Sequence, residues 1–211
     1  MKRRTAIFIS GRGSNMRALV EAAASPDFPA EIALVLSNRP DAEGLSYAKG
    51  RGVPVAAVDH KIHGSRDGFE AVVQRLLDLH RIELICLAGF MRLLTPPFVQ
   101  RWSGRLINVH PSLLPAYRGL RTHERALADG VKTHGCTVHF VAPEVDAGPI
   151  IAQAAVPVLD GDDVDSLAAR VLAQEHVLYP HALRLVASEA VRMMEGRVVG
   201  VGDGAALIAR A

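Results

Sequence analysis

The stretch Thr5-Ala-Ile-Phe-Ile-Ser-Gly-Arg-Gly-Ser-Asn15 decides the fold. Its first five residues form an apolar run of the kind that fills a buried strand, and residues 14–24 continue with apolar side chains at helical spacing. A glycine-containing turn therefore joins a buried strand to an amphipathic helix. This strand–turn–helix unit is typical of the start of an α/β fold.

The same alternation continues outward through the first half of the chain. Further strands are predicted at 32–36, 53–58, 84–88 and 105–109, and helices at 42–50, 66–80 and 96–102. Continuous apolar strands that alternate with helices predict a mostly parallel central sheet with helices on both faces. Such sheets bind their ligands beyond the carboxyl ends of the strands.

The pattern changes in the second half. Strands predicted at 134–141 and 149–158 form an antiparallel pair, and a long helix follows at 163–187, which Pro180 is expected to kink or divide. The tail at 188–211 is weakly patterned. Without an internal repeat or a low-complexity linker in the sequence, we expect a single domain over 1–211, with a first half at 1–109 and a second half at 110–187.

Composition excludes several classes of partner. The 24 basic and 22 acidic residues give a formal net charge of +2, which is too small to favour nucleic acid or an anionic membrane. No stretch reaches the ~18 apolar residues of a membrane span, and the run at 5–9 is too short for a signal peptide. The two cysteines, Cys86 and Cys136, lie in apolar runs and do not form a disulfide framework. We expect a cytoplasmic protein.

The glycine turn at 10–15 is a candidate phosphate site. Glycines expose backbone N–H groups, and the N-terminus of the following helix carries partial positive charge. Two better-known phosphate loops do not fit, because the third glycine of the dinucleotide pattern and the Gly-Lys-Ser/Thr of the Walker pattern are absent. A plain tight turn with a helix cap explains the same residues.

Asn108 and His110 form a second candidate. They are two residues apart at the end of a predicted strand, so their side chains point to the same face. An amide beside an imidazole suits the stabilisation of an oxyanion together with proton transfer. An ordinary strand end with a satisfied histidine is the alternative.

Asp146, in the turn Asp146-Ala-Gly-Pro149, is the third candidate. A carboxylate near an imidazole orients the ring and favours its charged form, although an aspartate before Gly-Pro is also common in plain turns. The spacing of the nine histidines matches no zinc motif, so we expect no metal. Ser112 lacks the surroundings of a serine nucleophile.

Taken together, these segments closely resemble one family, the phosphoribosylglycinamide formyltransferases, which are folate-dependent enzymes of purine synthesis. The resemblance runs from about residue 5 to about residue 187 and is carried by Ser-Gly-Arg-Gly-Ser-Asn (10–15), Leu-Ala-Gly-Phe-Met-Arg (87–92), Asn-Val-His-Pro-Ser-Leu-Leu-Pro (108–115), Asp-Ala-Gly-Pro (146–149) and Gln-Glu-His (174–176). It implies a Rossmann-like formyltransferase fold, with a nucleotide-binding half at 1–109 and a catalytic and folate-binding half at 110–187.

The resemblance implies a reaction. The formyl group of 10-formyltetrahydrofolate, the cosubstrate, would pass directly to the amine of N1-(5-phosphoribosyl)glycinamide (glycinamide ribonucleotide) through a tetrahedral oxyanion. The products would be formylglycinamide ribonucleotide and tetrahydrofolate, in de novo purine synthesis. Partners would be these small molecules, without nucleic acid or membrane, and the protein would be a monomer or a homodimer.

The resemblance also implies roles for residues. The catalytic group would be Asn108, His110 and Asp146. The ribonucleotide would be held by Gly13, Ser14, Asn15 and Glu175. The folate pocket would be formed by Arg66, Met91, Arg92, Leu93, Leu94, Asn108, Ala142, Pro143, Glu144, Val145 and Asp146. Two positions depart from the family pattern, since Arg121 stands where a histidine occurs and Leu172 where a polar residue near the phosphate is expected.

Several alternatives stay open. A formyltetrahydrofolate hydrolase keeps the same three catalytic residues but usually carries an N-terminal regulatory domain. A methionyl-tRNA formyltransferase is expected to have a further C-terminal RNA-binding domain. A non-catalytic nucleotide-binding module would use the glycine turn alone, and the lack of a third glycine disfavours a dinucleotide-dependent dehydrogenase. No function is assigned to the tail at 188–211.

Overall fold

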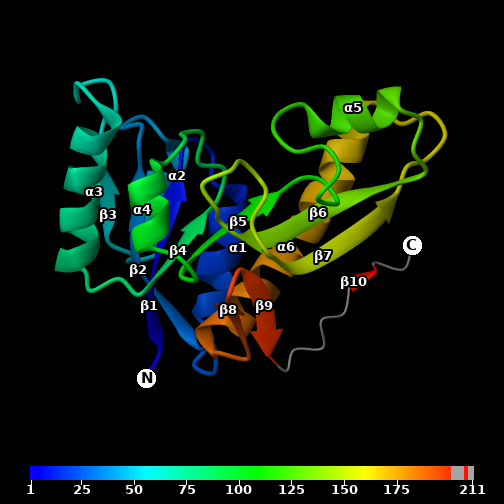
Figure 1. The fold of residues 1–211 in the computed structure, drawn as a ribbon. Helices are drawn as coiled ribbons and strands as arrows, with labels where there is room; N and C mark the ends of the chain where they lie inside the picture. The colour runs from blue at the N-terminus through cyan, green and yellow to red at the C-terminus, as the bar shows by residue number, and fades with distance from the viewer. Residues whose placement is uncertain (201–206, 209–211) are drawn as a thin grey trace.

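A single large sheet organises the molecule in the computed structural model, which describes residues 1–200 and 207–208 (Figure 1). Its eight strands lie in the order β10-β7-β6-β5-β4-β1-β2-β3. Their bounds are β1 Arg3–Ile9, β2 Ala30–Ser37, β3 Val55–Ala57, β4 Leu84–Leu87, β5 Leu106–His110, β6 Thr133–Phe140, β7 Ile150–Pro157 and β10 Leu207–Ile208.

The sheet is mostly parallel, as the sequence predicted. Pairing is parallel from β3 through β2, β1 and β4 to β5. β6 is antiparallel to both β5 and β7, which gives the expected antiparallel pair in the second half. The last described strand, β10, pairs parallel with β7.

Helices cover both faces of the sheet, which confirms the predicted layers. Their bounds are α1 Ser14–Ala23, α2 Glu43–Gly50, α3 Arg66–Leu79, α4 Pro96–Arg101, α5 Thr122–Ala128 and α6 Val164–Ala187. One apolar core joins the sheet to α1, α2 and α6, with Leu19 and Tyr179 fully buried in it. A second core lies on the opposite face against α3 and α4 and includes Phe69 and Trp102.

Some elements differ from the sequence-based expectation. α6 continues through Pro180 as one helix, so the proline does not divide it. α5 was not predicted; its N-cap, Arg121, has a φ of 59° and provides no side-chain cap. The tail contains a hairpin of β8 (Val191–Met194) and β9 (Arg197–Gly200). Residues 201–206 and 209–211 of that tail lie outside the described residues.

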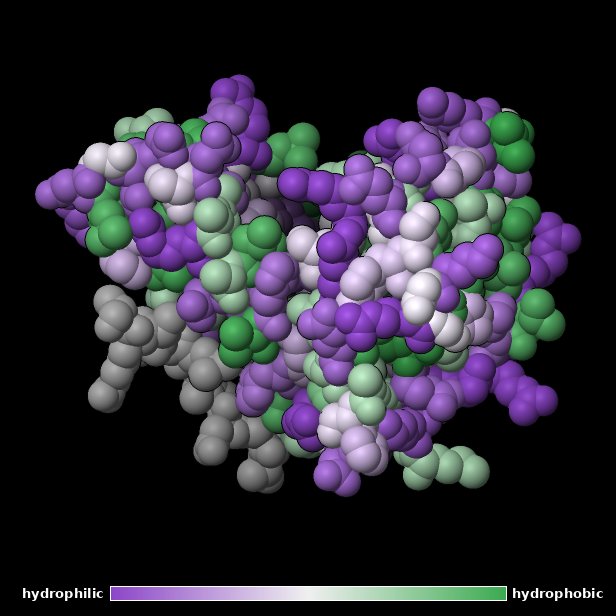
Figure 2. Space-filling view, turned by 180° about the vertical axis from the view of Figure 1, so that it is seen from behind, coloured by the Kyte–Doolittle hydropathy of each residue, from purple (hydrophilic) through white to green (hydrophobic). Residues whose placement is uncertain are grey.

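The chain order creates a switch point between β1 and β4. From β1 the chain moves outward to β2 and β3, and β4 then returns to the other side of β1. Loops that leave the carboxyl ends of these two strands diverge, which is where open α/β sheets bind ligands. From behind, the surface is hollowed between a raised side that carries α3 and another that carries α5 (Figure 2). Among the described residues, no helix is long and apolar enough to cross a membrane.

Candidate active site

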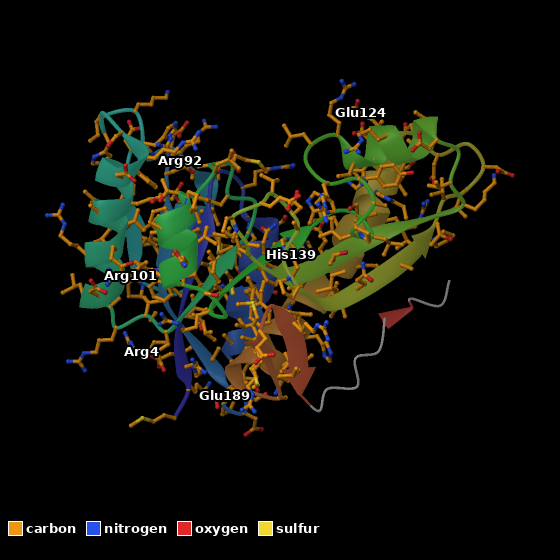
Figure 3. The ribbon with its side chains drawn as sticks, in the orientation of Figure 1. Arg4, Arg92, Arg101, Glu124, His139 and Glu189 are labelled. Atoms are coloured by element: carbon orange, nitrogen blue, oxygen red, sulfur yellow. The ribbon has the colours of Figure 1, made fainter. Side chains whose placement is uncertain are left out.

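The candidate catalytic residues gather at the carboxyl edge of the sheet, between the two raised sides. Asn108 and His110 belong to β5, and Asp146 lies in the loop between β6 and β7. His139, on the neighbouring β6, lies at the centre of the molecule, with Arg92 and Glu124 on the two sides (Figure 3). Two neighbouring strands and the loop that joins β6 to β7 therefore contribute to one small region.

His110 and Asp146 form an ion pair, although they are far apart in sequence. His110 Nδ1 lies 3.3 Å from Asp146 Oδ2, and both side chains are largely buried. The other ring nitrogen, Nε2, lies 2.9 Å from the Tyr117 carbonyl oxygen. Because both nitrogens face acceptors, a ring that satisfies both contacts carries a proton on each nitrogen. The carboxylate thus lies against Nδ1 and the Tyr117 carbonyl oxygen against Nε2, which together fix the orientation of the ring.

The backbone around Asp146 explains how this carboxylate reaches the histidine. Asp146 has a φ of 50°, in the left-handed region. Two residues later, a Cβ on Gly148 would lie 1.7 Å from the Phe140 carbonyl oxygen, so only glycine fits the close approach of this loop to β6. The Gly119 amide donates to Asp146 Oδ2 at 2.9 Å. The carboxylate is therefore held from its own loop and from the 111–121 segment.

His139 is a site residue that the sequence reasoning missed. Its Nε2 lies 3.3 Å from Asn108 Nδ2 and 3.7 Å from Asp146 Oδ1, so it joins the two candidate catalytic side chains. Burial lowers the pKa of His139, against a smaller opposing effect of its contact with the Phe140 carbonyl and of Asp146. In its neutral form, the His139 ring accepts a hydrogen bond at Nε2 from the side-chain amide of Asn108. The signal in sequence was its place on an alternating strand beside the one that carries Asn108.

Two further histidines, His123 and His134, lie near His110. The rings of His123 and His134 meet edge to face with centroids 5.2 Å apart, and His134 also meets Tyr117. Burial and the neighbouring His123 and His110 together lower the pKa of His134 to about 4, although a contact with the Pro111 backbone opposes them. Burial and then the charge of His110 lower the pKa of His123 as well. Both rings are neutral supports of the segment that carries Tyr117.

The glycine turn at 10–15 presents backbone donors to an open cavity. Gly13, with a φ of 71°, is the N-cap of α1; it gives no side-chain cap, and the first turn of the helix has no acidic residue. The helix N-terminus is thus free to receive an anion. A cavity of about 480 Å³ lies against the turn and reaches Arg39 and Met91.

Two of the predicted ribonucleotide-binding residues contact each other. Asn15 Nδ2 donates to Glu175 Oε2 at 2.6 Å, joining α1 to α6. Burial raises the pKa of Glu175, and the Asn15 contact partly offsets that effect. The other amide atom, Asn15 Oδ1, is buried without a partner among the described residues. This orphaned oxygen is a further polar group at the base of the turn.

A second cavity, of about 130 Å³, fits the predicted folate pocket in part. Of the predicted residues, Arg92, Leu93, Leu94, Asn108, Ala142, Pro143, Val145 and Asp146 line it. Three do not. Met91 lines the cavity at the glycine turn instead. Glu144 is exposed and paired with Arg118 at 2.9 Å, and Arg66 begins α3. Sequence reasoning did not include Phe90 and His139, which also line this cavity.

Within the described residues, no group of histidine, cysteine, aspartate and glutamate side chains could hold a metal ion. The arrangement offers an imidazole–carboxylate pair beside an amide donor, and Asn108 and Asp146 line the smaller cavity. The larger cavity lies against the glycine turn, and the smaller one combines apolar side chains with Arg92, Asn108, His139 and Asp146. Such a site can bring two reactants together and stabilise an oxyanion between them.

Comparison with known proteins places the chain. Residues 3–183 match the formyl transferase family model. The trifunctional purine biosynthetic protein adenosine-3 of Gallus gallus is 51% identical, over 92% of this chain and 19% of that protein. This chain thus spans about a fifth of the length of such relatives. Phosphoribosylglycinamide formyltransferase of Escherichia coli is 41% identical, over 90% of this chain and 89% of that protein.

A solved structure agrees with these relatives. Glycinamide ribonucleotide transformylase 1 from Symbiobacterium toebii superposes with a TM-score of 0.91 at 43% identity, covering 95% of each chain. The fold and these neighbours define an α/β fold of the formyl transferase class. The chain belongs to the formyl transferase family and, within it, to the phosphoribosylglycinamide formyltransferases.

Proposed function

We propose that this chain transfers the formyl group of 10-formyltetrahydrofolate to the amine of glycinamide ribonucleotide in de novo purine synthesis. The observation that carries the proposal is the His110–Asp146 pair, 3.3 Å apart, with Asn108 and Asp146 lining the smaller cavity. The likeness to phosphoribosylglycinamide formyltransferases supports the choice of both substrates.

The two cavities receive the two substrates. The ribonucleotide phosphate accepts hydrogen bonds from the turn at Gly13, Ser14 and Asn15, and Glu175 contacts the sugar or glycinamide end. The pterin enters the cavity lined by Arg92, Leu93 and Leu94 on one side and by 142–146 on the other. Both reactants are bound at once, so holding them in reacting geometry supplies a large part of the catalysis.

The proposed chemistry takes place at Asn108, His110 and Asp146. The ribonucleotide amine attacks the formyl carbon, and the formyl oxygen becomes an oxyanion. The imidazolium of His110 and the Asn108 amide donate hydrogen bonds to this oxyanion. For His110 to do so, its Nε2 must exchange the Tyr117 carbonyl for the oxyanion. Deletion of a donor of this kind costs ~10²–10³ in rate.

Collapse of the tetrahedral species completes the transfer. The bond from carbon to the folate nitrogen breaks, and the proton lost by the attacking amine passes to that nitrogen through His110 or a water at Asp146. No enzyme nucleophile takes part. The two free cysteines, Cys86 and Cys136, are buried, and burial raises the pKa of both thiols to about 12, so neither offers a thiolate. We propose a cytoplasmic location, where thiols stay reduced.

An absorbance assay tests the proposal. Purified protein is mixed with 10-formyltetrahydrofolate, with and without glycinamide ribonucleotide, and loss of the formyl folate is followed. Consumption that requires the ribonucleotide is the expected result. Equal consumption without it would make water the acceptor and the protein a hydrolase. Absence of consumption in both mixtures would withdraw the catalytic roles of Asn108, His110 and Asp146.

A further inference from the structure

We propose that Ser10 is a positioning residue that fixes the phosphate-binding turn and the folate-binding loop relative to each other. The hydroxyl of this serine, at the carboxyl end of β1, joins the loops that follow three neighbouring strands. The inference rests on the proposed function, because it takes residues 11–15 as the ribonucleotide side of the site and 92–94, directly after Met91, as the folate side.

The contacts of the hydroxyl are specific. Ser10 Oγ donates to Asn38 Oδ1 at 2.6 Å, and Asn38 follows β2. The same oxygen accepts from the Met91 amide at 2.8 Å, and Met91 lies in the loop after β4. Because β2, β1 and β4 are adjacent in the sheet, one hydroxyl links three consecutive carboxyl-end loops.

The partner side chain is itself held in place. Asn38 is 3% exposed and Ser10 6% exposed, so water does not readily replace these bonds. His60 Nδ1 lies 2.9 Å from the Asn38 carbonyl oxygen and 3.2 Å from its Nδ2. The amide of Asn38 thus cannot rotate without losing contacts at both of its ends.

The network lies directly against the substrate side of the fold. Ser10, Asn38, His60 and Met91 all line the cavity of about 480 Å³ that also faces the glycine turn. Ser10 is the first residue of that turn, and its hydroxyl accepts a hydrogen bond from the amide of Met91, the residue directly before Arg92 of the folate side. A displacement of either loop therefore stretches a bond to the same oxygen.

This arrangement predicts a kinetic signature for Ser10→Ala. The substitution leaves the Met91 amide and the Asn38 carbonyl group of the side chain without their partner, so both loops lose a shared anchor. We expect KM to rise about fivefold to tenfold for both substrates, with kcat within about threefold of the wild type. Ser14→Ala, in the turn alone, should raise the ribonucleotide KM and leave the folate KM unchanged. Ser10→Thr, which keeps a hydroxyl, should restore both values.

A second readout does not depend on turnover. Titration of the wild-type protein with ribose 5-phosphate alone should shift the Met91 amide resonance in a nitrogen–proton NMR spectrum. The shift should be reduced at least by half in Ser10→Ala at saturation. If Ser10→Ala does not fold, Ser10→Cys, which is a similar shape with weaker hydrogen bonds, replaces it with the same expected direction.

Three results would overturn the inference. One is a lower melting temperature of Ser10→Ala with both KM values unchanged, which would make the hydroxyl structural only. Another is a rise in a single KM, and the third is an unaltered Met91 shift in the variant. If the wild type does not transfer a formyl group, the proposed function fails, and the NMR titration still decides whether Ser10 connects the two loops.

Discussion

The two regions at the carboxyl edge of the sheet are built in different ways. The phosphate-binding turn comes from one continuous segment, in which a strand end, two glycines and an uncapped helix follow one another within six residues. The catalytic group draws Asn108, His139 and Asp146 from two strands and a loop. His110, also on β5, pairs with Asp146, which lies 36 positions later in the sequence. The first region depends on local backbone geometry and the second on tertiary contacts.

This difference leads to a division of labour. In the proposed reaction, backbone N–H groups of the turn would contact a phosphate that stays unchanged, so they would contribute equally to substrate and transition-state binding. The side chains around Asp146 would act on charge that develops only in the transition state. Variants in the turn should change KM, and variants in the catalytic group should change kcat.

Asp146→Asn should have the largest effect on kcat, and it separates the roles of the two regions most clearly. The variant keeps the size of the side chain but removes the negative charge 3.3 Å from His110 Nδ1. We expect kcat to fall by ~10²–10³ with both KM values within about threefold, as for loss of an oxyanion-stabilising group. Steady-state kinetics measures both. An increase in KM at unchanged kcat would place Asp146 in substrate binding instead.

Gly148→Ala should disturb the catalytic group through the backbone. The new Cβ would meet the Phe140 carbonyl oxygen at 1.7 Å, so the loop that holds Asp146 must shift. We expect a loss of about 1–3 kcal/mol in the free energy of unfolding, together with a lower kcat. Gly50→Ala is the matched control, because a Cβ there has open space. Wild-type turnover in Gly148→Ala would show that the position of Asp146 does not matter.

His134 should make stability depend on pH. Its folded pKa of about 4 is below the ordinary value of 6.5, so its contribution is full above pH 6.5 and is lost as the pH falls towards 4. Replacement by asparagine should flatten the pH dependence of the unfolding free energy in that window by about 2 kcal/mol. Urea titrations at several pH values measure this slope. An equal slope in wild type and variant would mean that His134 accepts a proton in the folded protein.

Asn15→Ala and Ser14→Ala should have the smallest effects on turnover, because both residues lie in the glycine turn and not in the catalytic group. Asn15→Ala also leaves the buried Glu175 carboxyl without its donor at 2.6 Å. We expect ribonucleotide binding to weaken about tenfold, or about 1.4 kcal/mol, with kcat nearly unchanged. Titration calorimetry gives the Kd. Unchanged affinity in both variants would remove the phosphate from this turn.

The two regions also differ in how far the sequence predicts them. The strands and helices of the first half followed from apolar periodicity, because continuous runs such as 5–9 and 84–88 are buried on both faces of the sheet. The helix α5 and the hairpin β8–β9 were not predicted from the sequence, because their short segments lack a strong periodic signal.

The same limit applies to the site. The turn at 10–15 was visible because its residues are contiguous. The 3.3 Å approach of His110 to Asp146 and the bridging position of His139 arise only from the pairing of β5 with β6 and from the close approach at Gly148. Arg66 and Glu144, assigned by resemblance to the folate pocket, do not line the cavity in the structure, and their folate roles stay a prediction.

The central claim is that the formyl group moves directly between two substrates held at these two regions. The most direct test is to mix the protein with 10-formyltetrahydrofolate labelled in the formyl carbon and to sample the label before and after glycinamide ribonucleotide is added. We expect the label to stay on the folate before the ribonucleotide is added and to appear in formylglycinamide ribonucleotide afterwards. Label on the protein before the addition would contradict direct transfer, and label released as formate would contradict the ribonucleotide amine as the acceptor.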